Sequence, residues 1–174
     1  DSTSSADKRI TPIGKIIRKF KIDELPQLLN VLMGEMTLVG PRPNVRNDVK
    51  IYTEEEKILL SVKPGITDFS SIIFSDEGEI LSEFEDPDLK YNQLIRPWKS
   101  RLGLFYIKKK SIVLDTLLIF ITIIAIFNKK FAINFIVKIL EFFKADFSLI
   151  DVCRRDKELI PHPPPGSRDV VRER

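Results

Sequence analysis

Residues 21–43 constrain the fold of this chain most, because their prolines and glycines limit where a helix can begin and end. Pro26 has no backbone N–H and fits only the first turn of a helix, and Gly34 lies where such a helix would stop. Between them, apolar residues recur with helical spacing at Leu25, Leu28, Leu29 and Leu32. The pattern predicts a short amphipathic helix with Asp23 and Glu24 at its N-terminus.

Asp23 and Glu24 are adjacent carboxylates at this expected helix N-terminus. The unpaired backbone N–H groups and the positive end of the helix dipole favour an ionised carboxylate, and any phosphate beside it. An aspartate in front of an amphipathic helix, taken alone, is more often an N-cap than a catalytic group. Both interpretations stay open at this point.

A stiff arginine-containing loop is predicted just after the helix. Met36 to Val39 is a short apolar segment, predicted to be a buried strand, and it leads into Gly40, Pro41, Arg42 and Pro43. The two prolines fix φ on either side of Arg42 and remove local donors, so its guanidinium is expected to project from a rigid loop. Such a group suits bidentate contact with a phosphate, although a lone arginine of this kind is usually an ordinary surface residue.

A basic amphipathic helix is predicted upstream of these residues. Thr11 is a candidate N-cap and Pro12 the first helical residue, followed by apolar residues on one face at Ile13, Ile16, Ile17 and Phe20. Residues 8–21 contain six Lys or Arg and no acid. The helix either lies at an anionic surface with Arg18 turned toward phosphates, or presents an ordinary solvated basic face.

Taken together, these residues resemble the core of the bacterial sugar transferases, the monotopic phosphoglycosyl transferases that begin surface-glycan assembly at the membrane. In that family a basic helix precedes Asp-Glu-Leu-Pro-Gln-Leu, Asn-Val-Leu, Gly-(Asp/Glu)-Met and Gly-Pro-Arg-Pro, and this chain has each element in order. The chain begins at Asp1 without the hydrophobic hairpin helix that anchors the family. We therefore expect an N-terminally incomplete member.

The resemblance implies a two-step transfer that initiates exopolysaccharide or lipopolysaccharide synthesis. Asp23 would attack the sugar-bearing phosphate of a nucleotide diphosphosugar, expected to be a uridine derivative, and polyprenyl phosphate would then accept the phosphosugar. Arg18, Arg42 and Mg²⁺ would neutralise phosphate charge, with Pro41 and Pro43 framing the substrate loop. Glu24 would hold the metal or position Asp23, and Asp115, in the family's Leu-Asp context, is a further candidate metal ligand.

Two departures from the family pattern keep other hypotheses open. Many members follow Pro-Gly-Ile-Thr with Gly and a strand ending in Gly-Arg, whereas this chain has an aspartate, Asp68, followed by Phe69 to Phe74. Gly103 stands where members often have an acid. The alternative function is therefore a catalytically degenerate scaffold module of a glycan-assembly complex at the membrane surface. A soluble nucleotide-binding domain is a third hypothesis, which predicts no association with vesicles.

Two apolar segments are predicted to be interfacial helices. Residues 111–127 would extend about 26 Å as a helix, short of a bilayer core of about 30 Å, and they include Asp115. Residues 131–143 contain Lys138 and Glu141, and fit an amphipathic helix that rests on lipid or packs on the domain. The resemblance to the sugar transferases implies that these helices lie at the cytoplasmic face of the inner membrane.

Three shorter patterns give local predictions. Thr53 and Glu56 have the spacing of a capping box for a short helix. Gly65 follows Lys-Pro in an expected turn, where it would be free to adopt a positive φ. Residues 76–88 contain seven acids and no base, and are predicted to be a solvated helix or loop.

The expected fold is α+β, a small compact domain of mostly helices with a few short strands and amphipathic membrane-surface helices. Residues 1–127 would form the sugar transferase core, 128–150 an amphipathic extension, and 151–174 a disordered tail. A single cysteine, Cys153, excludes an intrachain disulfide, and the lone His162 argues against histidine-based chemistry. The net charge of +3 is too small to require a nucleic-acid partner, and a homodimer stays open.

Overall fold

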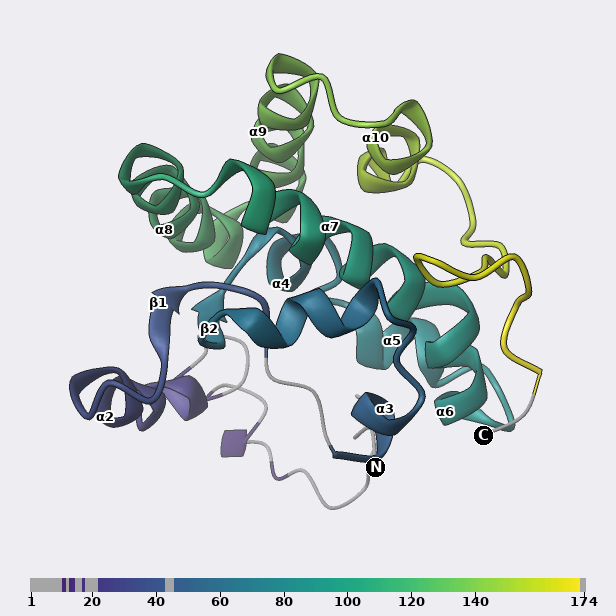
Figure 1. The fold of residues 1–174 in the computed structure, drawn as a ribbon. Coiled ribbons are helices and arrows are strands. Elements are labelled where there is room, and N and C mark those ends of the chain that lie inside the picture. Colours follow the sequence, from purple (N-terminus) through teal and green to yellow (C-terminus); the bar gives the residue numbers. More distant parts are fainter. Residues whose placement is uncertain (1–10, 12, 15–16, 18–21, 43–45, 173–174) are drawn as a thin grey trace.

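The structure, a computed structural model, describes residues 11, 13–14, 17, 22–42 and 46–172. Helices dominate these ranges, and two short strands, β1 (Thr37–Val39) and β2 (Gly65–Thr67), pair in parallel. The predicted α+β class is confirmed. In Figure 1 the small sheet lies at one side of the molecule, between α2 (Gln27–Leu32) below and α8 (Ile112–Phe127) above.

The remaining helices build the rest of the domain around α7. In chain order they are η1 (Ile22–Glu24), α3 (Arg46–Lys50), η2 (Glu56–Ser61), α4 (Phe69–Ile73), α5 (Glu77–Leu81), α6 (Pro87–Lys90), η3 (Tyr91–Ile95), α7 (Arg96–Lys109), α9 (Lys129–Phe142) and α10 (Phe147–Arg154). The elements η1 and η2 are 3-10 helices, and η3 is a π-helical turn that leads directly into α7. Helix α7 crosses the centre of the molecule in Figure 1.

The hydrophobic core lies where α4, α7, α8 and α9 meet. Phe69 and Ile73 of α4, Leu102 of α7, Leu118 of α8 and Ile136 of α9 are all fully buried. Burying such side chains contributes about 1.5–3 kcal/mol each relative to leaving them exposed. The predicted apolar segments thus form helices whose inner faces complete the core.

The outer faces of α8 and α9 are also apolar. Ile112, Phe120 and Phe127 on α8, and Phe131 and Phe142 on α9, are exposed. The predicted apolar stripe of α2 is also uncovered, since none of its residues is buried. None of the helices in the described part of the chain combines the length and apolar character needed to cross a bilayer.

The predicted cap of the N-terminal helix agrees with the few residues described there. The backbone N–H of Gly14 donates to Thr11 Oγ1 at 3.1 Å, which is the hydrogen bond that an N-cap threonine makes. Ile13 is exposed. Ile16 and Phe20 lie outside the described residues.

A buried ion pair joins η2 to the start of α7. The predicted capping box is confirmed, because Thr53 N donates to Glu56 Oε2 and Glu56 N donates to Thr53 Oγ1, each at 3.1 Å. The Glu56 carboxylate also pairs with Arg96 and accepts from Ser100 Oγ at 2.7 Å. Glu56 and Arg96 are both almost completely buried, and Arg96 donates further to Asn92 Oδ1 at 3.0 Å. The charges are therefore satisfied inside the protein.

The acidic run at residues 76–88 is more than the solvated helix or loop that the sequence predicted. It forms α5 and α6, but Asp76 pairs with Lys129 at 2.9 Å and with Arg155 at 3.2 Å, and Glu77 pairs with Lys99. Basic residues far along the chain thus neutralise its first acids. The charge count of the run did not reveal these distant partners.

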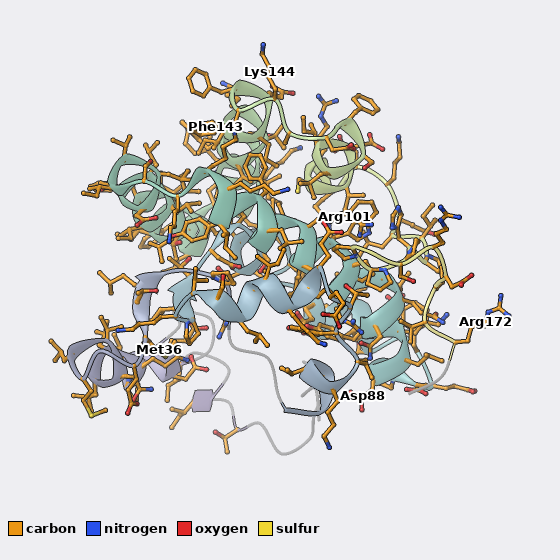
Figure 2. The ribbon with its side chains drawn as sticks, in the orientation of Figure 1. Met36, Asp88, Arg101, Phe143, Lys144 and Arg172 are labelled. Atoms are coloured by element: carbon orange, nitrogen blue, oxygen red, sulfur yellow. The ribbon has the colours of Figure 1, made fainter. Side chains whose placement is uncertain are left out.

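The C-terminal residues also differ from the predicted disordered tail. Helix α10 continues to Arg154, and the following segment runs back along α7 (Figure 1). The His162 ring lies 4.4 Å from the Trp98 ring, and Arg101, labelled in Figure 2, donates to the Pro163 carbonyl at 3.0 Å. Prolines lack a donor, but their carbonyls accept hydrogen bonds from neighbouring helices. The domain boundaries at 127 and 150 stay predictions.

Removing Arg96 should be strongly destabilising. Arg96→Leu leaves the Glu56 carboxylate buried without its cation, and we expect the free energy of unfolding to fall by about 3–5 kcal/mol. Arg154→Leu, which breaks an exposed pair with Glu141, is the control and should cost less than about 1 kcal/mol. Urea denaturation of the two variants measures the difference; equal losses would contradict the role assigned to the buried pair.

The packing of the C-terminal segment can be tested by fluorescence, because Trp98 is the only tryptophan. Trp98 is 3% exposed beneath His162. His162→Ala should shift its emission to longer wavelength and increase quenching by acrylamide. Ile160→Ala, at a side chain that is 69% exposed, should leave both unchanged. Identical spectra for the two variants would mean that this segment does not cover Trp98.

Candidate active site

Asp23 and Glu24 lie in the 3-10 turn η1, which precedes α2, and not in the first turn of α2 itself. Leu25 N donates to the Ile22 carbonyl at 3.1 Å, and the N-cap position of α2 is occupied by Pro26, with φ −59° and no capping side chain. The predicted stop at Gly34 is confirmed, since this residue has φ +76° just after the helix.

The position of Asp23 does not support the N-cap interpretation. Its side chain is exposed and makes no hydrogen bond or ion pair with another described residue. Its oxygens thus stay open toward solvent, as a nucleophile for a soluble substrate requires.

An ion pair brings Glu24 and Arg42 together. Arg42 Nη1 lies 3.0 Å from Glu24 Oε1, with 35% of the arginine side chain and 16% of the glutamate side chain exposed. A pair this accessible adds little stability, so its main effect is positional. It fixes the η1 turn against the loop after β1, and the guanidinium has five N–H donors, enough to contact a phosphate as well.

The loop that carries Arg42 depends on two glycines that touch across the sheet. Gly40 N donates to the Thr67 carbonyl and Gly65 N to the Pro41 carbonyl, both at 3.0 Å. A Cβ added to Gly65 would lie 2.1 Å from Gly40 N and 2.5 Å from its Cα. The predicted turn at Gly65 is wrong: the residue begins β2, is not among the glycines with positive φ, and is needed for the close backbone approach.

The predicted buried strand at residues 36–39 is confirmed in part. Strand β1 covers Thr37 to Val39, and Met36 and Val39 are buried, but Leu38 is 46% exposed. Its outward side chain faces an open cleft beside the sheet. Alternation along a short strand at the edge of the domain explains the difference.

The segment that departs from the family pattern lies near the Arg42 loop. Asp68 caps α4 by accepting from Ser71 N at 2.7 Å, and Ser70 Oγ donates to the same carboxylate. Asp68, Ser70 and Arg42 line one small cavity. The carboxylate is buried and satisfied, which indicates a structural role.

Gly103 faces the same loop from α7. A Cβ at this position would lie 3.6 Å from Pro41 Cβ and 2.7 Å from Leu59 Cδ2. The glycine therefore leaves room for the Leu59 side chain, while α7 lies beside buried Pro41. An acidic side chain at position 103 would occupy the space beside Pro41, next to the candidate site.

Asp115 occupies a different wall of the site. Tyr106 Oη donates to Asp115 Oδ1 at 2.7 Å and lies 3.2 Å from the Val39 carbonyl, which connects α7, α8 and β1. Burial, this hydrogen bond and the charge of the carboxylate raise the pKa of Tyr106 above its ordinary value. The described residues hold no group of three or more acidic, histidine or cysteine side chains suited to a metal ion, so Asp115 is not gathered with Asp23 and Glu24 into such a group.

Two residues of the predicted phosphate and substrate site lie outside the described part of the chain. Arg18 and Pro43 lie among the residues that the structure does not describe, and their roles stay predictions. Sequence reasoning, in turn, missed Lys63 and Lys110, which line the cleft beside β1 together with Asp115. These two lysines are more than forty positions apart in the sequence, so no local pattern predicts that they share a cleft.

The sequence model of the family described as bacterial sugar transferase matches residues 1–129. The chain belongs to this family. That range contains the η1 turn, the Arg42 loop, Gly103 and Asp115, so every predicted site residue of this sugar transferase lies inside the match.

Curated relatives of this sugar transferase share its core. It is 36% identical over 120 residues to a UDP-N-acetylgalactosamine-undecaprenyl-phosphate N-acetylgalactosaminephosphotransferase of Aeromonas hydrophila, covering 67% of this chain and 25% of the relative. It is 42% identical over 127 residues to an undecaprenyl-phosphate glucose phosphotransferase of Komagataeibacter xylinus, covering 70% and 22%. With the sugar transferase EpsL of Bacillus subtilis it shares 53% identity over 64 residues, covering 37% and 32%. The chain thus spans a third or less of each relative's length.

Substitution of Gly65 should disrupt the loop more than substitution of Gly103. A Cβ at position 65 meets the backbone of Gly40, which cannot move without breaking the sheet, and we expect Gly65→Ala to cost more than about 2 kcal/mol. A Cβ at position 103 meets only the flexible end of Leu59, and alanine favours the helix, so Gly103→Ala should stay within about 1 kcal/mol. Thermal unfolding compares them, and the reverse order would refute the assigned constraint.

Proposed function

We propose that this chain is the catalytic part of an enzyme that transfers a phosphosugar from a nucleotide diphosphosugar to polyprenyl phosphate. A uridine diphosphosugar is the expected donor. The observation that supports this most is the Glu24–Arg42 ion pair, which joins the turn of exposed Asp23 to the Arg42 loop. The names of the Aeromonas and Komagataeibacter relatives describe transfers of this kind onto undecaprenyl phosphate.

The proposed reaction has two displacements at one phosphorus atom. An Asp23 carboxylate oxygen attacks the sugar-bearing phosphorus, and the phosphoanhydride bond breaks to release the nucleoside monophosphate. A phosphate oxygen of the polyprenyl phosphate then attacks the same phosphorus, which breaks the acyl phosphate bond and restores Asp23. Arg42 would contact the phosphate oxygens in both steps, and Arg18 stays a predicted second cation.

Mg²⁺ fits the residues present. Magnesium is commonly held by one or two carboxylates together with substrate phosphates and water, and Asp23 and Glu24 supply adjacent carboxylates in one turn. When bound there, Mg²⁺ would neutralise charge on the donor diphosphate. Glu24 already pairs with Arg42, so it would also orient the guanidinium. Asp115 is not part of this proposal, because Tyr106 engages its carboxylate on another wall.

Association with the cytoplasmic face of the inner membrane is the second part of the proposal. The exposed apolar side chains of α8 and α9 include Phe120, Phe127, Phe131 and Phe142. Lysines accompany them, with Lys130 and Lys138 exposed on α9. Apolar side chains flanked by lysines suit a helix lying in the headgroup layer of an anionic membrane.

A catalytically degenerate scaffold module is the competing function. It is favoured by Gly103, since the position next to Pro41 carries no acid. Release of nucleoside monophosphate on adding a nucleotide diphosphosugar separates the two, because a scaffold module releases none.

Replacing Asp23 should abolish transfer. Full-length protein is incubated with Mg²⁺, radiolabelled uridine diphosphosugars and polyprenyl phosphate, and label in lipid product is counted. Asp23→Asn removes the nucleophile, and we expect activity to fall by at least about 1,000-fold. Asp156→Asn, at an exposed aspartate near the C-terminus, is the matched control and should retain full activity.

The covalent intermediate gives the second readout. Mass spectrometry of wild-type protein quenched without acceptor should find a phosphosugar on Asp23. Sustained turnover by Asp23→Asn, once deamidation of the asparagine is excluded by peptide mapping, would refute the nucleophile assignment.

A further inference from the structure

An open cleft lies beside the candidate site, between α2 and α8, with β1 as its floor. Its volume is about 580 Å³. Figure 1 shows β1 between these two helices, and Met36, labelled in Figure 2, marks the end of the cleft where α2 leads into the strand. The walls are mostly apolar, with Val31 from α2, Leu38 and Val39 from β1, and Ile119 from α8.

Two lysines from distant parts of the chain line this cleft. Lys63 precedes β2, Lys110 follows α7, and both are exposed. Neither forms an ion pair or hydrogen bond with another described residue. The lining also includes one acid, Asp115, whose carboxylate accepts a hydrogen bond from Tyr106. The lining charges thus leave an excess of positive charge above an apolar floor.

The helices beside the cleft carry further exposed apolar side chains. Leu28 lies one turn from Val31 on α2, Ile112 lies one turn from Asp115 on α8, and both are exposed. Inside the cleft, Thr37, Ser61 and Tyr106 add hydroxyl groups to the lining, and the other uncharged side chains are apolar. A single phosphate on a long apolar chain matches both the lysines and the walls.

The cleft adjoins the loop of the proposed reaction centre. Val39 and Gly40 line the cleft, and Pro41 and Arg42 follow them directly in the chain. The geometry points to this cleft as the binding site of the polyprenyl phosphate acceptor, with Lys63 and Lys110 contacting its phosphate and the apolar walls holding its first isoprene units. This inference rests on the proposed function and adds the residues that select the acceptor.

The acceptor site is tested by measuring the two half-reactions separately in detergent, so that membrane partitioning does not contribute. The full-length enzyme is assayed for exchange of nucleoside monophosphate with donor, and for transfer to a short prenyl phosphate. Lys63→Gln and Lys110→Gln should each raise the KM for prenyl phosphate by about tenfold, as expected for loss of a charge-assisted hydrogen bond. The KM for the donor should change less than about twofold.

Matched variants separate binding from folding. Lys157→Gln removes the same charge from an exposed pair with Asp151, and should leave both KM values unchanged. Lys63→Arg and Lys110→Arg restore the cation and should recover most of the acceptor affinity. Inorganic phosphate should compete far more weakly than the prenyl phosphate, because it cannot use the apolar walls.

Each outcome has a defined meaning. An unchanged KM for prenyl phosphate with normal exchange would overturn the acceptor site alone. Equal rises in donor and acceptor KM would also overturn it, since the lysines would then serve the fold. Equal competition by inorganic phosphate would overturn the role of the apolar walls. Failure of the wild-type enzyme to exchange nucleoside monophosphate would instead refute the proposed function.

Discussion

The contact between the Gly40 and Gly65 backbones is the constraint on which the rest of the candidate site depends. Because neither residue has a side chain, the two backbones approach closely enough for Gly65 N to donate a hydrogen bond to the Pro41 carbonyl. That hydrogen bond fixes the start of the loop, and the loop in turn presents Arg42 to Glu24. The position of the Asp23 turn relative to Arg42 thus depends on β1 and β2, the two short strands found in the described part of the chain.

Helix α7 packs against the elements that carry the candidate site. At its start, Arg96 is buried against Glu56 and fixes η2. In its middle, Gly103 faces Pro41 and leaves room for Leu59, and near its end Tyr106 reaches both Val39 and Asp115. Helix α7 therefore links the buried ion pair, the Arg42 loop and the wall of the cleft. Its other side is covered by the C-terminal segment through Trp98.

Local sequence patterns predicted the local features of this fold well. The cap at Thr11, the end of α2 at Gly34 and the capping box of Thr53 and Glu56 all depend on residues a few positions apart. Long-range interactions explain the corrections. The acids of α5 meet Lys129 and Arg155, and the proline-rich segment meets side chains of α7, which neither composition nor periodicity reveals. Gly65 was expected to serve a turn, and its actual role requires the partner strand.

The sequence by itself determined the family, the α+β class and the candidate residues Asp23, Glu24 and Arg42, because short motifs carry that information in consecutive positions. Only the tertiary structure decided that Glu24 pairs with Arg42, that Asp115 lies on a separate wall with Tyr106, and that Lys63 and Lys110 share a cleft. The physical reason is that these contacts join residues from different elements. Their distances follow from how the sheet and α7 pack, and no local propensity encodes that packing.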